Sequence, residues 1–229
     1  MKLWTYLKSK MEQHPGQKIC EAGAMMTFEE MIIYAENFGK KLQGIRCCAI
    51  LCESEMAAGM ALLGCFAAGV TAVPLSSRYG SVHCRKILDA ICPDGCITDK
   101  GGELQILRDP AVPYKEPEDH PALIMCTSGT TGVPKGAMLT ENNIIANVLD
   151  ISKYFLIGAG DTILIARPLY HCAVLTGEFL TALVNGACIR FYSGGFNPME
   201  ILNLLQQYSI TVLGGTPTLL SLMGRFKPR

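Results

Sequence analysis

The sequence lacks a surplus of charge of either sign. It has 20 basic and 20 acidic side chains among 229 residues, and its longest basic clusters are Lys8-Ser9-Lys10 and Lys40-Lys41. A protein that binds nucleic acid through phosphates needs a basic surplus or stripe, so we expect no nucleic-acid partner. With 49% hydrophobic residues, the chain also lacks the composition of disordered proteins. The composition therefore predicts a globular protein.

The sequence lacks the cysteine and histidine spacings that are typical of metal sites, although cysteine is abundant. None of the 11 cysteines forms a C-x-x-C pair. His83-Cys84, Cys92 and Cys96 lie within fourteen residues, and Cys47-Cys48 are adjacent, which does not suit a tetrahedral zinc site. A metal site at these residues is the less favoured alternative. Residues 1–13 carry charges where a signal peptide has its apolar core. We predict reduced cysteines in a cytoplasmic protein, and no metal ligands in this chain.

A continuous membrane-spanning segment is lacking as well. Residues 56–75 contain no charge over twenty positions, a length at which a membrane helix must be considered. However, Gly59, Gly64, Gly69 and Pro74 interrupt the run, and alanine is more frequent than leucine. We interpret the run as a buried helix followed by a buried strand, and we predict no membrane span.

Helical and strand patterns alternate along the chain. Thr27 and Glu30 are spaced as a capping box, and residues 47–52 form an apolar run typical of a strand buried on both faces. Residues 109–121, with four prolines and four acidic residues, predict a linker. Further strands are predicted at 71–73, 96–98, 104–107, 122–126, 162–166, 187–191 and 210–213, and helices near Ser54, Ser81, Thr140, Cys172, Asn197 and Thr216. This alternation predicts an α/β fold with largely parallel sheets flanked by helices.

The segment with the strongest chemical signal is residues 127–136, Thr-Ser-Gly-Thr-Thr-Gly-Val-Pro-Lys-Gly. Four hydroxyls, three glycines and a lysine follow directly after a predicted buried strand. Glycines let several backbone N–H groups converge on one anion, and hydroxyls and lysine add donors, so we expect a polyphosphate ligand. Pro134 and Gly136 exclude a Walker A loop, and the dinucleotide G-x-G-x-x-G pattern is absent. From composition alone, a plain Ser/Thr/Gly surface loop is the alternative.

The whole string Cys126-TSGTTGVPKG-Ala137 resembles the signature loop of the adenylate-forming enzymes. These include acyl- and aryl-CoA synthetases, luciferases and the adenylation domains of peptide synthetases. Other segments resemble further family motifs, namely Thr27–Glu30, Ala72–Leu75, Leu139–Asn143, Pro168–His171 and Gly215–Thr218. Glu141 stands where the family commonly has histidine, and Val174 where it often has glycine. The resemblance covers nearly the whole chain.

The resemblance implies ATP as cofactor and a role for each residue of the loop. Hydroxyls would orient the β- and γ-phosphates, two glycines would permit the turn, and one lysine would supply charge. His171 would act as a gate between the nucleotide and acyl sites. A solvated lysine and a packed histidine are the plainer alternatives, and the other three histidines are interpreted as surface or structural. The implied phosphate-binding residues are Thr127, Ser128, Gly129, Thr130, Thr131, Gly132 and Lys135.

The resemblance also narrows the substrate. Amino-acid-activating relatives carry an aspartate in the motif that corresponds to residues 168–177, whereas this chain has no carboxylate there before Glu178. A carboxylic acid without an α-amino group is therefore implied. The acceptor thiol would belong to coenzyme A or to the pantetheine of a carrier protein, and nothing in this sequence distinguishes the two.

The sequence stops at Arg229, about halfway through the family pattern. The segment that holds Mg²⁺, the ribose-binding aspartate and the small domain with its lysine do not occur. A fragment, one half of a split enzyme, and a truncated non-catalytic binding module are the alternatives, and we expect the chain alone to be inactive. We predict a first subdomain at 1–167 and an incomplete second one at 168–229, with self-association or partner binding through the last sixty residues.

Overall fold

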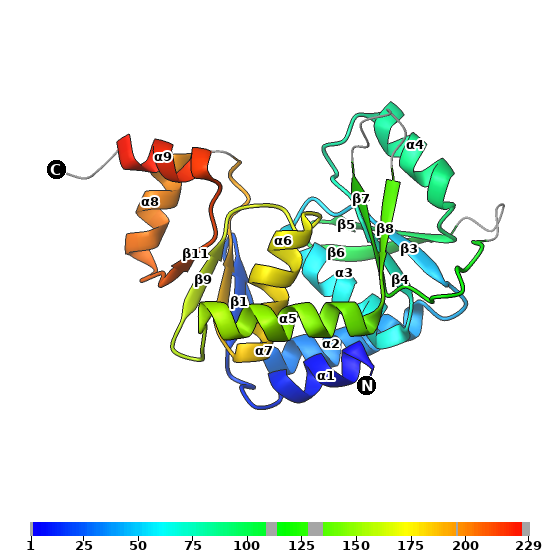
Figure 1. Ribbon diagram of the computed structural model, residues 1–229, viewed down its shortest axis with the longest axis horizontal. Coiled ribbons are helices and arrows are strands. Elements are labelled where there is room, and N and C mark those ends of the chain that lie inside the picture. Colours follow the sequence, from blue (N-terminus) through cyan, green and yellow to red (C-terminus); the bar gives the residue numbers. More distant parts are fainter. Residues whose placement is uncertain (1, 109–113, 128–134, 196, 226–229) are drawn as a thin grey trace.

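The computed structural model describes residues 2–108, 114–127, 135–195 and 197–225, without the side chains of Ser81 and Thr127. It consists of two mostly parallel sheets with helices packed around them (Figure 1). The predicted α/β class is thus confirmed. Helices α8 (Pro198–Gln207) and α9 (Pro217–Arg225) lie at one end of the molecule, and α4 (Ser81–Ile91) lies at the other.

The six-stranded sheet has the order β6-β5-β3-β4-β7-β8. Its strands are β3 (Cys47–Ile50), β4 (Thr71–Pro74), β5 (Gly95–Lys100), β6 (Glu103–Arg108), β7 (Leu123–Thr127) and β8 (Lys135–Leu139). The inner pairs β3–β4, β3–β5 and β4–β7 are parallel, whereas β5–β6 and β7–β8 are antiparallel hairpins. All four residues of β3 are buried, as the apolar run predicts.

The ends of the predicted loop at 127–136 belong to strands, which corrects the sequence-based assignment. Thr127 ends β7 and pairs with Lys135, and Cys126 pairs with Gly136. A side chain at Gly136 would come within 2.6 Å of the Ile124 side chain, so glycine allows the hairpin to close there. The loop itself is therefore shorter than predicted, and β8 was not anticipated.

The five-stranded sheet has the order β11-β9-β10-β1-β2. Its strands are β1 (Lys18–Glu21), β2 (Ala24–Thr27), β9 (Thr162–Ile165), β10 (Cys188–Phe191) and β11 (Val212–Leu213). In Figure 1 the blue β1 lies among strands from the later part of the chain, because it pairs in parallel with β10. The β1–β2 hairpin was not predicted, and both residues of its Ala22-Gly23 turn have positive φ.

The two sheets do not divide the chain at residue 167. Strands β1 and β2 share their sheet with β9, β10 and β11, so the first 27 residues contribute to the same layer as residues 162–213. The proposed subdomain ranges 1–167 and 168–229 stay a prediction.

Most helices begin where the sequence places their caps. The other helices of the first half of the chain are α1 (Leu3–Met11), α2 (Phe28–Lys41) and α3 (Glu55–Ala68), and α5 (Glu141–Phe155) follows β8. Capping boxes occur at Thr27 and Thr140, and Ser54 and Asn197 cap α3 and α8. Helix α4 is capped by Gly80 instead of Ser81, which is its first residue and not its cap.

The uncharged run at 56–75 folds as most of α3 followed by β4. Helix α3 has fourteen residues and is buried on nearly all sides, with α2 packed closely against it. Across the described ranges, no helix has the length and apolar character needed to cross a membrane.

Candidate functional site

A cavity of about 380 Å³, here called the cleft cavity, opens between the two sheets. Its walls follow the carboxyl ends of β3, β4, β9 and β10. Ligands of open α/β sheets bind at these ends of the strands. Its polar lining includes Glu53, Glu55, Ser76, Ser77, Arg78, Arg167, Tyr170, Tyr192, Ser193 and Thr216.

The predicted phosphate loop leaves the six-stranded sheet at this same edge. Strand β7 is parallel to β4, with Ala72 opposite Leu123, so the carboxyl ends of both strands lie on one side. The residues after β4 line the cleft cavity, and the loop follows β7. Ser128, Gly129, Thr130, Thr131 and Gly132 lie outside the described residues, and their roles stay predictions.

Four aromatic rings connect the two sheets beside the cavity. His83 packs edge-on against Tyr79 at 4.8 Å between centroids, and Tyr79 packs against Tyr170 at 5.6 Å. Tyr170 in turn contacts His171 at 4.3 Å. Tyr79 follows β4, whereas Tyr170 follows β9, so these rings join segments that are far apart in the sequence. The sequence analysis interpreted His83 as surface or structural and assigned no role to Tyr79.

His171 is the last of these four rings, and it is the N-cap residue of α6 (Cys172–Val174). The residue is exposed overall, yet the surrounding protein partly desolvates its ring. This burial, together with the positive charge of Arg167, lowers the pKa of His171 below its usual value. The imidazole is therefore mainly neutral near pH 7.

Glu55 holds the segment that leads to His171. Its Oε2 accepts a hydrogen bond from the Leu169 N–H at 2.8 Å, across 114 residues of sequence. Burial raises the pKa of Glu55 to about 7, helped by nearby Glu21 and opposed by the Leu169 N–H and Arg78. Glu21 itself accepts hydrogen bonds from the first backbone N–H groups of α3, where the helix dipole favours a negative charge. Sequence reasoning missed both carboxylates.

Glu178 pairs with Arg167 behind the same segment. Arg167 Nη2 donates to Glu178 Oε1, and the glutamate is only 5% exposed. Burial raises the pKa of Glu178, although the arginine beside it acts in the opposite direction. Glu178 lies in a π-helical turn, η1 (Leu175–Leu180), between α6 and α7 (Thr181–Asn185), so the helix predicted after Cys172 is divided into three parts. Such turns are often found at functional sites.

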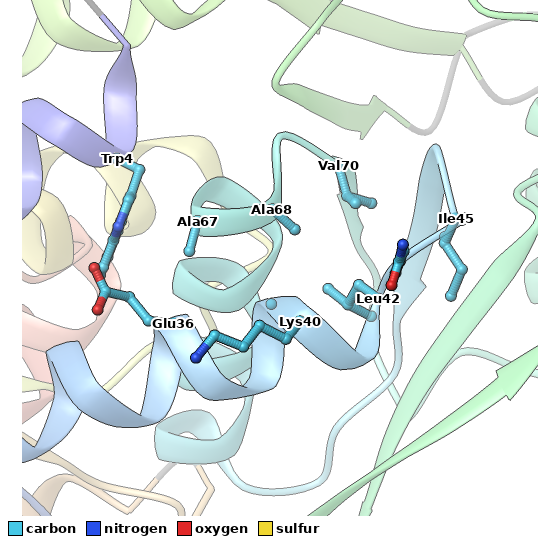
Figure 2. Close-up of a pocket in the computed structure, with 11 residues that line it drawn as sticks. Trp4, Glu36, Lys40, Leu42, Ile45, Ala67, Ala68 and Val70 are labelled. Carbon is cyan, nitrogen blue, oxygen red and sulfur yellow. The ribbon is translucent and has the colours of Figure 1, made fainter.

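A larger hollow, here called the amino-edge hollow, lies at the opposite ends of β3 and β4. It measures about 680 Å³, and Ile45 and Val70, which precede these strands, line it. Figure 2 shows Trp4 and Glu36 on one side of it and Lys40 on another. Parallel sheets bind ligands at their carboxyl ends, so we assign the candidate site to the smaller cleft cavity.

Cysteines contribute apolar packing to this fold. Cys47, Cys48, Cys52 and Cys65 are buried, and burial raises the pKa of Cys126 to about 11. The Cys126 thiol is therefore protonated near neutral pH. Within the ranges that the structure covers, no group of three or more histidine, cysteine or acidic side chains is placed to hold a metal ion.

The model of the AMP-binding enzyme family matches residues 7–229. The chain therefore belongs to the AMP-binding enzyme family. Feruloyl-CoA synthase of an Amycolatopsis species is 25% identical over 251 residues, covering 94% of this chain and 48% of that protein. Sulfoacetate–CoA ligase of Cupriavidus necator is 32% identical over 168 residues, covering 59% of this chain and 33% of that protein. The chain thus spans half or less of the length of these relatives.

Solved structures show the same fold. Apo MatB from Rhodopseudomonas palustris matches with a TM-score of 0.81 at 22% identity, over 98% of this chain and 51% of that chain. The ATP-bound form of MatB matches with the same TM-score at 23% identity, over 97% of this chain and 50% of that chain. At these identities the likeness establishes the architecture only.

Proposed function

We propose that this chain is part of an ATP-dependent acid–thiol ligase, which activates a carboxylic acid as acyl-AMP and passes it to a thiol. The observation that carries the proposal is the sequence TSGTTGVPKG, which begins at the last residue of β7 and ends in β8. Strand β7 is parallel to β4, and the residues after β4 line the cleft cavity. Membership of the AMP-binding family and the CoA-ligase names of the relatives support it.

The phosphate loop would bind ATP through backbone N–H groups, hydroxyls and Lys135. Attack of a carboxylate on the α-phosphorus brings two anions together, so the protein must position them and offset their charge. Mg²⁺ would supply further neutralisation when bound, and we assign no ligand for it among these 229 residues. Its ligand, like the ribose anchor and the small-domain lysine, would come from the remainder of the family pattern.

The cleft cavity would receive the acid, with His171 as the gate at its side. The first carboxylate after Pro168 is Glu178, and its contact with Arg167 leaves it unsuited to bind a substrate ammonium. Glu55 already accepts the Leu169 N–H, and with a pKa of about 7 it carries only part of a charge near neutral pH. Both observations favour an acid without an α-amino group. Coenzyme A and a carrier-protein pantetheine remain alternative acceptors.

A second candidate function is a non-catalytic module that binds a nucleotide, an acyl ligand or a partner protein. One half of a split enzyme is a further alternative, and this chain spans half or less of the length of the relatives named above. Self-association through residues 170–229 belongs to the same proposal, because β11 is an edge strand of its sheet and Leu220 of α9 is half exposed. Sedimentation at high concentration tests this, and a strict monomer would contradict it. The cytoplasmic location likewise remains a prediction.

Pyrophosphate exchange tests the main proposal. The isolated chain and its mixture with a polypeptide carrying the other family motifs are each assayed with aliphatic and aromatic acids. We expect exchange in the mixture only, because the chain alone lacks the metal ligand and the lysine of the family. Pyrophosphate exchange well above background in the isolated chain would contradict the expectation that this chain is inactive on its own. Absence of any loop perturbation by ATP or pyrophosphate in the mixture would contradict the loop assignment.

A further inference from the structure

Residues 168–171 form a tight turn at the wall of the cleft cavity. The His171 N–H donates to the Pro168 carbonyl at 3.2 Å, which closes a turn with Leu169 and Tyr170 at its two central positions. Pro168, Leu169 and Tyr170 all line the cleft cavity. Because His171 is the last residue of this turn, the placement of the two central residues decides where His171 lies.

Helix α3 contacts Leu169 from two positions that are one helical turn apart. Glu55 Oε2 accepts the Leu169 N–H at 2.8 Å. At Gly59, a Cβ atom would lie 3.5 Å from Leu169 Cδ1 and only 3.0 Å from Cζ of Phe179, which belongs to η1. Residues four apart lie on the same face of a helix, so Glu55 and Gly59 face the turn together. Leu169 is only 1% exposed, and α3 holds both its backbone N–H and its side chain.

The glycine at position 59 has a reason in this packing. Glycine is less favourable than alanine in the interior of a helix, because it loses more backbone freedom on folding. Gly59 lies in the first half of α3 and is buried, and the space beside it is taken by Leu169 and Phe179. The absence of a side chain therefore lets the turn and η1 come close to α3.

The second central residue of the turn contacts the imidazole. The ring centroids of Tyr170 and His171 are 4.3 Å apart, and on its other side Tyr170 packs against Tyr79 at 5.6 Å. Tyr170 directly follows Leu169, so a displacement of Leu169 also moves the ring that packs on His171. Contacts of α3 with one buried residue are thus passed to His171 through the turn.

We propose that Glu55 and Gly59 are positioning residues for His171, which they orient by fixing Leu169 in the turn. Glu55 fixes the backbone of Leu169, and Gly59 leaves the space that the Leu169 side chain needs. The importance for catalysis rests on the proposed function, in which His171 is the gate beside the acid. A reacting group that is misplaced by about 1 Å can cost about 10²-fold in rate.

NMR of the isotope-labelled 229-residue chain tests the proposal through the amide exchange of Leu169 and the imidazole signals of His171, which His171→Gln identifies by their loss. Glu55→Leu removes the acceptor, so the Leu169 amide should exchange about tenfold faster and the His171 signals should shift. Glu55→Gln keeps an acceptor and should restore both readouts. Glu53→Leu is the matched control, because Glu53 lines the same cavity with an exposed side chain, and neither readout should change.

A pair of glycine variants separates positioning from a general loosening of α3. Gly59→Ala and Gly64→Ala both favour the helix, but the added Cβ atoms press on different neighbours. At position 59 the neighbour is Leu169, whereas at position 64 it is Phe38 of α2, at 2.6 Å. Only Gly59→Ala should shift the His171 signals. The nearby Tyr170 ring makes these signals sensitive to small displacements.

An unchanged exchange rate of the Leu169 amide in Glu55→Leu would overturn the proposal, and so would His171 signals that shift equally in Gly59→Ala and Gly64→Ala. If Glu55→Leu does not fold, unshifted His171 signals in Gly59→Ala overturn it. Because neither ATP nor acid is present in these measurements, a failure of the proposed ligase function leaves the result unaffected, and the reverse also holds.

Discussion

The cleft cavity and the amino-edge hollow lie at opposite ends of the same parallel strands. The amino-edge hollow is larger, yet its charged groups have partners nearby, with Glu36 bound to Lys8 at 2.6 Å and Lys40 bound to Asn37 at 3.2 Å. The cleft cavity is smaller but has a carboxylate of raised pKa and an arginine with an unsatisfied buried nitrogen. We therefore choose the candidate site by strand direction and by incompletely satisfied polar groups, and not by cavity volume.

The largest expected effect concerns the predicted phosphate loop that follows β7. Changing Thr130 and Thr131 together to alanine should lower pyrophosphate exchange in the reconstituted mixture by about 10²–10³-fold, because donors to the transition-state charge are lost. Lys40→Ala in the amino-edge hollow is the control and should leave exchange unchanged. Equal rates for the loop variant and the unchanged chain would remove the basis for choosing the cleft cavity.

The next effect compares two ion pairs. Glu178→Gln should lower the free energy of unfolding by about 2–3 kcal/mol, because it leaves Arg167 partly buried without its counter-charge. Glu36→Gln should cost about 0–1 kcal/mol, because both side chains of the Lys8–Glu36 pair are about one third exposed. Urea unfolding measures both values. A similar loss of unfolding free energy in the two variants would contradict the difference in burial between the Arg167–Glu178 pair and the Lys8–Glu36 pair.

Glu55 predicts a pH dependence of stability. Its pKa is about 7 in the folded state against an ordinary value of 4.5, so between these values the unfolded chain loses its proton first. Stability should therefore fall as the pH rises from about 4.5 to 7, by about 3 kcal/mol from this group, and then level off. Glu55→Gln keeps an acceptor for the Leu169 N–H and should remove this decline. Urea unfolding of both proteins at pH 5 and at pH 8 measures the difference. If both proteins lost the same free energy of unfolding between these pH values, the role of burial at Glu55 would be contradicted.

The smallest effect is expected in the amino-edge hollow. Lys40→Ala should change the free energy of unfolding by less than about 0.5 kcal/mol, because the side chain is exposed and its hydrogen bond to Asn37 is local. Fluorescence of Trp4, the single tryptophan, gives a direct signal for this region during urea unfolding. A loss above 1 kcal/mol would indicate that the hollow has a structural role that its contacts do not explain.

Local signals predicted much of this fold. The capping box at Thr27, the helix start at Thr140 and the buried strand at Cys47 depend on residues within a few positions of each other, and these predictions were confirmed. The β1–β2 hairpin was missed because its strands have only four residues and its turn is Ala22-Gly23, which lacks the usual asparagine or aspartate. Strand β8 was missed because its glycine and lysine also fit a loop.

Residues of the candidate site could be proposed from the sequence only where they belong to one continuous motif. The loop at 127–136 and His171 were proposed from short motifs, and their roles stay predictions. Glu55 was not proposed, because its partner Leu169 is 114 residues away and its burial depends on the packing of both sheets. The contact of Glu178 with Arg167 depends on the π-helical turn, which places the carboxylate where a regular helix from Cys172 would not be expected to place it. Long-range contacts of this kind have no local sequence signal.

The parallel pairing of β1 with β10 has a consequence for the order of folding. During synthesis, Lys18–Glu21 emerges early, but its partner Cys188–Phe191 is added only after more than 160 further residues. The inner strands β3, β4 and β5 of the other sheet, by contrast, lie within residues 47–100 and can pair much sooner. Closing so long a loop is slow, and unpaired strand edges are prone to aggregate. We therefore expect the β1–β2 hairpin to acquire protection from hydrogen exchange late, together with β9 and β10, although it leaves the ribosome well before these strands.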